Sequence, residues 1–65
     1  MNLILLHAED FLNPTQVRLY GRRREHVLNI HRAAVGDELR VGLLNGLLGH
    51  GKIHSLTDQV LELEI

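Results

Sequence analysis

Apolar and polar residues alternate in several short stretches of this 65-residue chain, and in one stretch they follow the spacing of a helix. Alternation is typical of a half-buried β-strand, because successive side chains point to opposite faces of a sheet. Strands are therefore expected at about 2–6, 17–20 and 39–43, then from about residue 47, and last in the segment that ends at Ile65. The pattern predicts the order strand, strand, helix and three strands.

The one predicted helix covers about residues 22–34 and follows the second strand. Gly36 with Asp37 is expected to end it, because glycine accepts a left-handed backbone at little steric cost. Its apolar side is predicted to consist of Val27, Leu28, Ile30, Ala34 and Val35. His31 lies inside this apolar stripe. We interpret it as a partly buried ring that bonds a backbone carbonyl, with a pH-sensitive weak point as the alternative.

About five short strands and one helix predict a mainly β domain, in the form of a small and strongly curved barrel. Closure into a barrel removes the exposed edges that so few strands would otherwise have. A split α+β sandwich is the alternative fold. Asn45-Gly46 is a strong hairpin signal, and Thr57-Asp58 offers another turn. Gly49 and Gly51 indicate a bulge, a bend or a close backbone approach.

Composition limits what such a domain can do. At 65 residues the chain is one small domain, and its lack of cysteine excludes disulfides and thiolate metal sites. A reducing, cytoplasmic location fits this composition. The apolar start "NLILL" is too short to span a membrane. The last alternating segment, "VLELEI", runs to the final residue, so we expect a domain cut from a longer protein.

Charge is unevenly distributed along the chain. The whole chain has seven Lys and Arg against eight Asp and Glu, a net charge of −1, which by itself argues against nucleic-acid binding. Residues 16–32, however, contain five arginines and one glutamate, a net charge of +4. A positive patch of this kind attracts an anionic partner whatever the total charge of the protein.

Three arginines, Arg22, Arg23 and Arg24, fall in the first turn of the predicted helix. The helix dipole makes each cation unfavourable there by a few tenths to about 1 kcal/mol. A bound phosphate would reverse this effect, because free helix amides and guanidinium groups would both face the anion. Arg18 and Tyr20, on the outer face of the preceding strand, would widen the patch, with Tyr20 stacking a base. The alternative is a solvated surface whose aliphatic stems lie over the barrel.

Other chemistry fits the sequence less well. The segment "GLLGHGK", residues 46–52, has most of the phosphate-binding P-loop pattern, but Ile53 replaces the Ser or Thr that binds magnesium. The five histidines are not spaced as ligands of one metal ion. Ser55 is the only serine, and no pair of carboxylates is spaced for acid–base catalysis. We therefore expect no catalytic residue, no metal site and no cofactor in this chain.

One ordered combination of residues resembles a known family. The segment His26–Arg32, followed by Gly36-Asp37 and then by "LRVGLLNG" up to Gly46, is similar to the "H-L-x-x-V-L-R-x-x-x-G-D" signature of a bacterial RNA methyltransferase family. The likeness includes the preceding "VRLYG" and departs at His31, where the family usually has leucine. It is a likeness to the N-terminal PUA-like domain of that family, and it covers essentially all 65 residues.

The resemblance implies a function in RNA modification. The family methylates N3 of a uridine in small-subunit ribosomal RNA with S-adenosylmethionine, which is bound by a C-terminal SPOUT-class domain. That domain, usually dimeric, would lie outside this chain, so S-adenosylmethionine is not expected to bind here. The PUA-like barrel is expected to hold ribosomal RNA of the small subunit, with its own methyltransferase domain as a second partner. The resemblance also implies a cytoplasmic protein without a membrane partner.

The residues expected to contact RNA come from the charge pattern and from the resemblance together. The predicted phosphate contacts are Arg22, Arg23, Arg24 and Arg32, with Arg18 and His26 as secondary contacts and Tyr20 as a platform for a base. Arg32 has a structural alternative, which is pairing with Asp37. The alternative function is a protein-interaction domain, in which the apolar hairpin "VGLLNGLLG" presents Leu44 and Leu47 or Leu48 to the catalytic domain or to a second copy.

Overall fold

The computed structural model describes residues 3–43 and 45–65, without the side chains of Ile30 and His31. Within these residues, six strands form one sheet, accompanied by one α-helix and one 3₁₀ helix. The elements in chain order are β1 (Ile4–Leu6), the 3₁₀ helix η1 (Ala8–Asp10), β2 (Phe11–Asn13), β3 (Gln16–Tyr20), α1 (Gly21–His31), β4 (Glu38–Leu43), β5 (Leu48–Leu56) and β6 (Val60–Glu64). The predicted class, mainly β with one helix, is confirmed.

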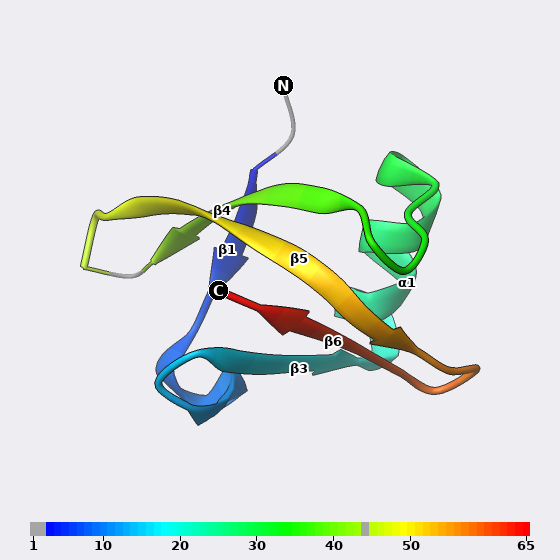
Figure 1. The fold of residues 1–65 in the computed structure, drawn as a ribbon, viewed down its shortest axis with the longest axis horizontal. Helices are drawn as coiled ribbons and strands as arrows, with labels where there is room; N and C mark the ends of the chain where they lie inside the picture. The colour runs from blue at the N-terminus through cyan, green and yellow to red at the C-terminus, as the bar shows by residue number, and fades with distance from the viewer. Residues whose placement is uncertain (1–2, 44) are drawn as a thin grey trace.

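The sheet is curled into a half-barrel, and α1 lies at one end of it (Figure 1). The strand order is β1-β4-β5-β6-β3-β2, and every neighbouring pair is antiparallel except β1 and β4. The long strand β5 pairs with β4 along its first half and with β6 along its second half. β1 and β2 are the two edges of the sheet and do not pair with each other. The sheet is therefore barrel-like, as predicted, but it is open rather than closed.

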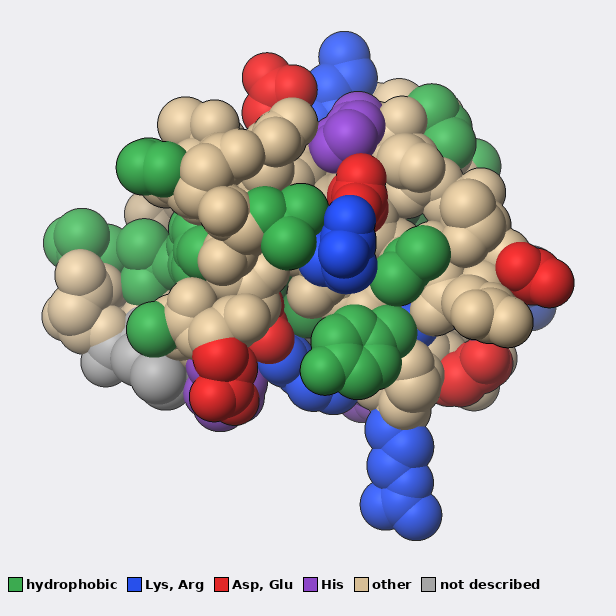
Figure 2. Space-filling model, turned by 90° about the horizontal axis from the view of Figure 1, so that it is seen from below, with side chains coloured by type: hydrophobic (Ala, Val, Ile, Leu, Met, Phe, Trp, Pro, Cys, Tyr) green, Lys and Arg blue, Asp and Glu red, His purple; other side chains and the backbone are tan. Residues whose placement is uncertain are grey.

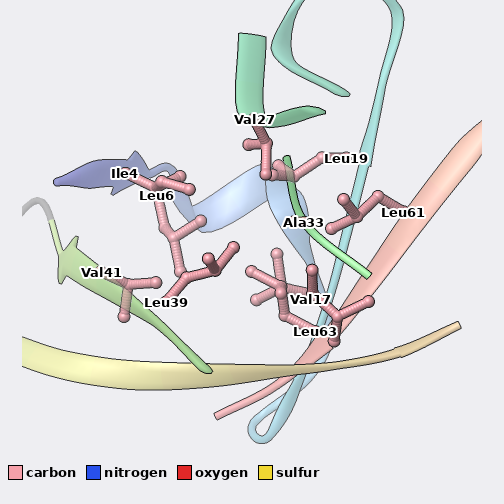
Figure 3. Close-up of a cluster of buried hydrophobic side chains, with 11 residues drawn as sticks. Ile4, Leu6, Val17, Leu19, Val27, Ala33, Leu39, Val41, Leu61 and Leu63 are labelled. Atoms are coloured by element: carbon pink, nitrogen blue, oxygen red, sulfur yellow. The ribbon is translucent and has the colours of Figure 1, made fainter. Parts of the chain in front are cut away.

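The core lies between the inner face of the half-barrel and one side of α1 (Figure 3). In β3, alternation buries Val17 and Leu19, while Arg18 and Tyr20 point outward, as predicted. The buried side chains are Ile4, Leu6, Val17, Leu19, Val27, Ala33, Leu39, Val41, Ile53, Leu61 and Leu63. Burial of one such aliphatic side chain contributes about 1.5–3 kcal/mol. Val27 is the α1 side chain among those described in this cluster, and it packs the helix against the sheet.

The helix is shorter than the predicted range 22–34. It spans Gly21–His31, because Arg32 takes a left-handed conformation with φ 48° and ψ 45°. The N–H of Arg32 donates to the carbonyl of Leu28 at 3.0 Å and completes this end of the helix. His31 was predicted to lie on the apolar side of the helix, but its side chain is outside the described part of the structure. Among the described residues, no helix is both long and apolar enough to cross a bilayer.

The segment after α1 is held by β5 rather than by the helix. Gly36 has a positive φ of 97°, but in this later turn and not at the helix end, and its N–H donates to the carbonyl of Ile53 at 2.7 Å. Ala33 is therefore buried, whereas Ala34 and Val35, which were predicted on the apolar side of the helix, are exposed. The shift follows from the helix ending three residues early.

One strand and the 3₁₀ helix were not predicted. β2 pairs with β3 so that Phe11 faces Val17, and η1 turns the chain from β1 into β2. The helix consequently follows the third strand and not the second. β1 begins at Ile4, and its predicted start at Asn2 lies outside the described residues.

Both predicted hairpin turns are present. The N–H of Gly46 donates to the carbonyl of Leu43 at 2.9 Å, and the positive φ of Gly46, 88°, is one that glycine favours. The N–H of Thr57 donates to the carbonyl of Val60 at 2.9 Å in the second turn. Leu44, which was predicted in the apolar hairpin, lies outside the described residues.

Gly51 is the glycine of β5 that permits a close approach. A Cβ atom there would lie 3.0 Å from Cδ1 of Ile65 and 3.4 Å from Cδ1 of Leu63, so the absence of a side chain lets the end of the chain pack against β5. The register shift of β5 lies between Ile53 and Ser55. The predicted bulge therefore lies a few residues beyond the two glycines.

Candidate nucleic-acid interface

The start of α1 carries the positive charge that the sequence predicts. Gly21, with φ 59°, follows the extended residue Tyr20 and opens the helix. No side chain caps the first amides, and the first turn contains no acidic residue. Arg22, Arg23 and Arg24 therefore lie where the helix dipole is already positive. Their partners in the fold decide which of them is available to an anion.

Arg23 is bound inside the protein. Its guanidinium forms an ion pair with Oδ1 of Asp10, and its Nη2 donates to the carbonyl of Leu5 at 2.7 Å. Asp10 is only 8% exposed, and its other oxygen accepts the N–H of His7 at 2.7 Å. Arg23 thus joins the first turn of α1 to η1 and β1, and it neutralises the one buried carboxylate of the described part.

Arg24 is bound to a different part of the fold. Its Nε and Nη2 donate to the carbonyl of Thr57, at 3.1 Å and 2.5 Å, in the turn between β5 and β6. Its Nη1 contacts Oε1 of Glu25 at 3.0 Å, and its side chain is 11% exposed. Arg24 therefore fixes α1 to the β5–β6 turn, with most of its donors already used.

Arg18 lies on the outer face of the sheet, where it is also paired. Its Nε donates to Oε2 of Glu62 at 2.8 Å, and the two residues face each other across β3 and β6. Nε2 of His54 on β5 lies 3.6 Å from the other oxygen of Glu62. These three side chains form a cross-strand row in which one carboxylate serves two basic groups.

Four of the predicted residues are exposed and have no hydrogen bond or ion pair from their side chains to the described part of the protein: Tyr20, Arg22, His26 and Arg32. Arg32 lies at the far end of α1, about 15 Å along the axis from Arg22 at 1.5 Å per residue. The alternative pairing of Arg32 with Asp37 is not among the described ion pairs. The Asp37 carboxylate instead accepts the N–H of Ala34 at 2.9 Å.

The seven predicted residues do not form one continuous patch. On the face shown in Figure 2, Lys and Arg side chains are separated from one another by acidic, apolar and backbone surface. Arg18, Tyr20 and Arg23 line one hollow beside the start of α1, with both arginines in paired form, and Arg22 lies in the same first turn of the helix. Arg24 is largely covered, and Arg32 is apart from the rest.

The sequence pattern missed the acceptors that hold these arginines. Asp10, Thr57 and Glu62 are 13, 33 and 44 residues away from the arginines that they contact. Helical and strand periodicities act over a few residues, so neither signals such a contact. The acidic "AED" segment that contains Asp10 was the one available sign of an anionic partner near the N-terminus.

Two kinds of site that the sequence makes improbable can also be compared with the structure. Within residues 3–43 and 45–65, no group of three or more His, Cys, Asp or Glu side chains is arranged to hold a metal ion. The P-loop-like segment 46–52 runs from the hairpin turn into β5, whereas a phosphate-binding loop leads into a helix. Gly46 of this segment serves the hairpin turn, and Gly51 permits the close packing of the chain end against β5.

The fold and this surface define a small β half-barrel with an arginine-rich helix start. Comparison of the chain with protein-family models, with curated proteins and with solved structures found no match.

Proposed function

We propose that this chain is an RNA-binding module, the PUA-like domain of a cytoplasmic methyltransferase that modifies a uridine of small-subunit ribosomal RNA at N3. The catalytic SPOUT-class domain, which would bind S-adenosylmethionine and form the dimer, lies outside residues 1–65 in this proposal. The sequence resemblance is one support, and the barrel-like sheet with a single helix after β3 is compatible with it. No catalytic step is assigned to this chain itself.

The observation that carries the proposal is the state of Arg22. It is exposed in the first turn of α1, its guanidinium has no partner in the described part, and the neighbouring amides have no side-chain cap. A phosphate at this point would meet free N–H donors, the positive end of the dipole and one free guanidinium. Tyr20, which is 69% exposed and two residues before Arg22, adds an aromatic face beside this position.

Arg23 and Arg24 are each bound to other residues of the fold, which reduces the number of arginines available to contact RNA. Their guanidinium groups already donate hydrogen bonds to carboxylate and carbonyl oxygens of the fold. Arg22 is therefore the main phosphate contact that we propose at the helix start. Arg18, His26 and Arg32 remain secondary contacts. Affinity for RNA is expected to be modest and strongly salt-dependent, because most of it would come from phosphate contacts.

The test is a titration of labelled small-subunit ribosomal RNA fragments, followed by fluorescence anisotropy at several salt concentrations. Arg22→Gln is expected to weaken binding and to reduce the salt slope by about 0.7–1, the contribution of one phosphate contact. Arg40→Gln is the matched control, since it removes the same charge from β4 on another part of the surface. Equal affinities of Arg22→Gln and the unchanged protein would refute the proposed contact.

A second candidate function, docking to another protein domain, is favoured by an exposed apolar row. Leu5, Gly42 and Leu48 face one another across β1, β4 and β5, and Leu5 and Leu48 are 58% and 66% exposed. A Cβ on Gly42 would lie 3.1 Å from Cδ2 of Leu3, so this leucine extends the row over the glycine. Leu47 in the adjoining turn is also exposed.

The occupant proposed for this row is the catalytic domain of the same polypeptide. Methyl groups of Leu3, Leu5 and Leu48 are expected to change chemical shift when that domain, expressed separately, is added. Leu48→Asp should abolish the shifts and leave RNA binding intact, because Arg22 lies on α1 and not on this row. Shift changes confined to α1 would exclude docking through the row.

A further inference from the structure

A hollow of about 350 Å³ lies beside the helix start, between η1, the second half of β3 and the first turn of α1. β2 pairs only with Gln16 and Val17, and the hollow lies along the rest of the β3 edge, which has no neighbouring strand on this side among the described residues. The side chains that line it are Glu9, Asp10, Arg18, Leu19, Tyr20 and Arg23. Three of these belong to the predicted RNA-contacting set, but Glu9 and Asp10 do not.

The charges around this hollow are balanced. Two guanidinium groups and two carboxylates line it, and Arg23 is paired with Asp10. Arg18 is paired with Glu62 on the neighbouring strand. The carboxylate of Glu9 is exposed and has no ion pair within the described residues. A phosphate would therefore gain little here, whereas a neutral group with N–H donors would find a free carboxylate acceptor.

Tyr20 supplies the apolar surface of the hollow. Tyr20 is the most exposed large hydrophobic residue of the described part, at 69%. An aromatic ring beside a polar hollow is the arrangement on which single-stranded bases stack, and the polar groups then contact the edge of the base. A volume of about 350 Å³ is large enough to admit one base.

We propose that this hollow binds one unstacked RNA base, with the Tyr20 ring as the stacking surface and the Glu9 carboxylate as the acceptor for the edge of the base. The inference rests on the proposed RNA-binding function, and it specifies which part of the RNA the protein recognises. Guanine is the base expected to bind best, since its adjacent N1–H and N2–H groups match the two oxygens of a carboxylate. Arg22 then contacts the phosphate backbone outside the hollow.

Tyr20 can be followed directly, because it is the only tyrosine and the chain has no tryptophan. The experiment titrates the protein with two single-stranded hexamers of equal charge, an RNA that contains guanine and an abasic ribose-phosphate oligomer. Anisotropy of a label on the oligomer measures all binding, and tyrosine emission measures contact with Tyr20. The emission is corrected for absorption by the RNA with free N-acetyltyrosinamide.

The guanine-containing RNA is expected to quench the tyrosine emission, and the abasic oligomer is not. Tyr20→Leu should weaken binding of this RNA by about 5- to 150-fold, the range that corresponds to loss of one base–aromatic stack. Tyr20→Phe keeps a ring and should retain most of the affinity. Circular dichroism of both variants confirms that each remains folded, so that lost binding is not lost structure.

Glu9→Gln tests the acceptor. The ratio of affinities for guanine-containing over uracil-only hexamers is expected to fall several-fold in Glu9→Gln and to stay unchanged in Glu38→Gln. Glu38 is the matched control because it is exposed on β4, away from the hollow. The ratio is used because removal of any carboxylate raises the affinity for all polyanions alike.

The outcomes separate this inference from the function on which it rests. RNA binding with unchanged tyrosine emission, and with equal affinity of Tyr20→Leu, would overturn the base site and leave the RNA-binding function standing. An unchanged guanine ratio in Glu9→Gln would overturn the role of Glu9. Absence of any anisotropy change with RNA, in the unchanged protein at low salt, would overturn both proposals together.

Discussion

Replacement of Arg23 by methionine tests whether the arginines of the helix start hold the fold. Methionine keeps an unbranched apolar stem and removes the guanidinium. The change breaks the ion pair with Asp10 and the bond from Nη2 to the carbonyl of Leu5, at 2.7 Å. Both contacts join α1 to the N-terminal segment, so we expect the free energy of unfolding to fall.

The size of the effect follows from burial. Removal of one partner from a fully buried ion pair costs about 3–5 kcal/mol, whereas an exposed pair contributes about 0–1 kcal/mol. Asp10 is 8% exposed but the Arg23 side chain is 36% exposed, so this pair lies between the two limits. The N–H of His7 still reaches the carboxylate, and removal of a cation from the helix start is itself slightly favourable. We expect a net loss of about 2 kcal/mol.

A loss of this size is measurable in so small a domain. A total stability of about 0.05–0.15 kcal/mol per residue corresponds to about 3–10 kcal/mol here. The expected loss lowers the melting temperature by about 8–16 °C. Urea unfolding followed by far-UV circular dichroism gives the free energy. Arg22→Met is the matched control, because it removes the same charge from the same turn without breaking a described contact, and its midpoint should stay or rise.

Equal unfolding midpoints for Arg23→Met and Arg22→Met would refute this reasoning. A double-mutant cycle with Asp10→Asn gives a second check. Asparagine is less costly than a carboxylate to leave unpaired, so Arg23→Met should cost less in the Asp10→Asn background. Additive effects of the two substitutions would mean that the ion pair contributes nothing to stability.

The remaining predictions concern backbone conformation and packing. Arg32→Gly is expected to raise the free energy of unfolding by about 1 kcal/mol, because glycine adopts the φ of 48° at this residue without a Cβ penalty. A lower urea midpoint would contradict this, and the proposed phosphate contact requires the same variant to bind RNA more weakly. Gly51→Ala is expected to lower stability by about 1 kcal/mol, since its Cβ would meet Ile65 at 3.0 Å. Gly49→Ala, whose nearest contact would be Val41 at 3.7 Å, should stay within about 0.5 kcal/mol, and equal thermal midpoints of the two variants would refute the comparison.

Alternation predicted β3 and β6 because one face of each strand is buried. Val17 and Leu19 of β3 are both buried, as this pattern predicts. β2 has no such signal, because Phe11–Asn13 is only three residues long and has no buried residue, and its pairing with β3 alone makes it a strand. The end of α1 was also beyond local rules, which do not favour a left-handed arginine.

Long-range hydrogen bonds explain that helix end. The N–H of Gly36 donates to the carbonyl of Ile53, and the N–H of Ile53 donates to the carbonyl of Asp37, at 2.7 and 2.9 Å. These two bonds tie the segment after α1 to β5 and leave too little chain for the predicted last turn. A glycine pattern shows that a left-handed turn is present, but tertiary pairing decides where the helix stops.

The sequence predicts where the positive charges of the candidate site lie, but not which residues bind them. A local count finds the arginines of residues 16–32, whereas the acceptors for Arg23 and Arg24 come from η1 and from the β5–β6 turn. Arginine in the first turn of a helix is unfavourable only until an acceptor is near. The fold supplies such acceptors to Arg23 and Arg24. Of the three adjacent arginines, only Arg22 is therefore exposed without a partner in the described part.

These internal contacts make the proposed RNA site depend on the stability of the fold. Arg23 and Arg24 join the same helix turn to two different parts of the fold, and that turn carries Arg22 and follows Tyr20. Arg23→Met should therefore weaken RNA binding near its melting temperature, in proportion to the unfolded fraction. At 10 °C, with nearly all molecules folded, it should retain most of the affinity that Arg22→Gln loses. The reverse order at 10 °C would mean that Arg23 leaves Asp10 and contacts phosphate itself, and the ion pair would then be a feature of the free protein alone.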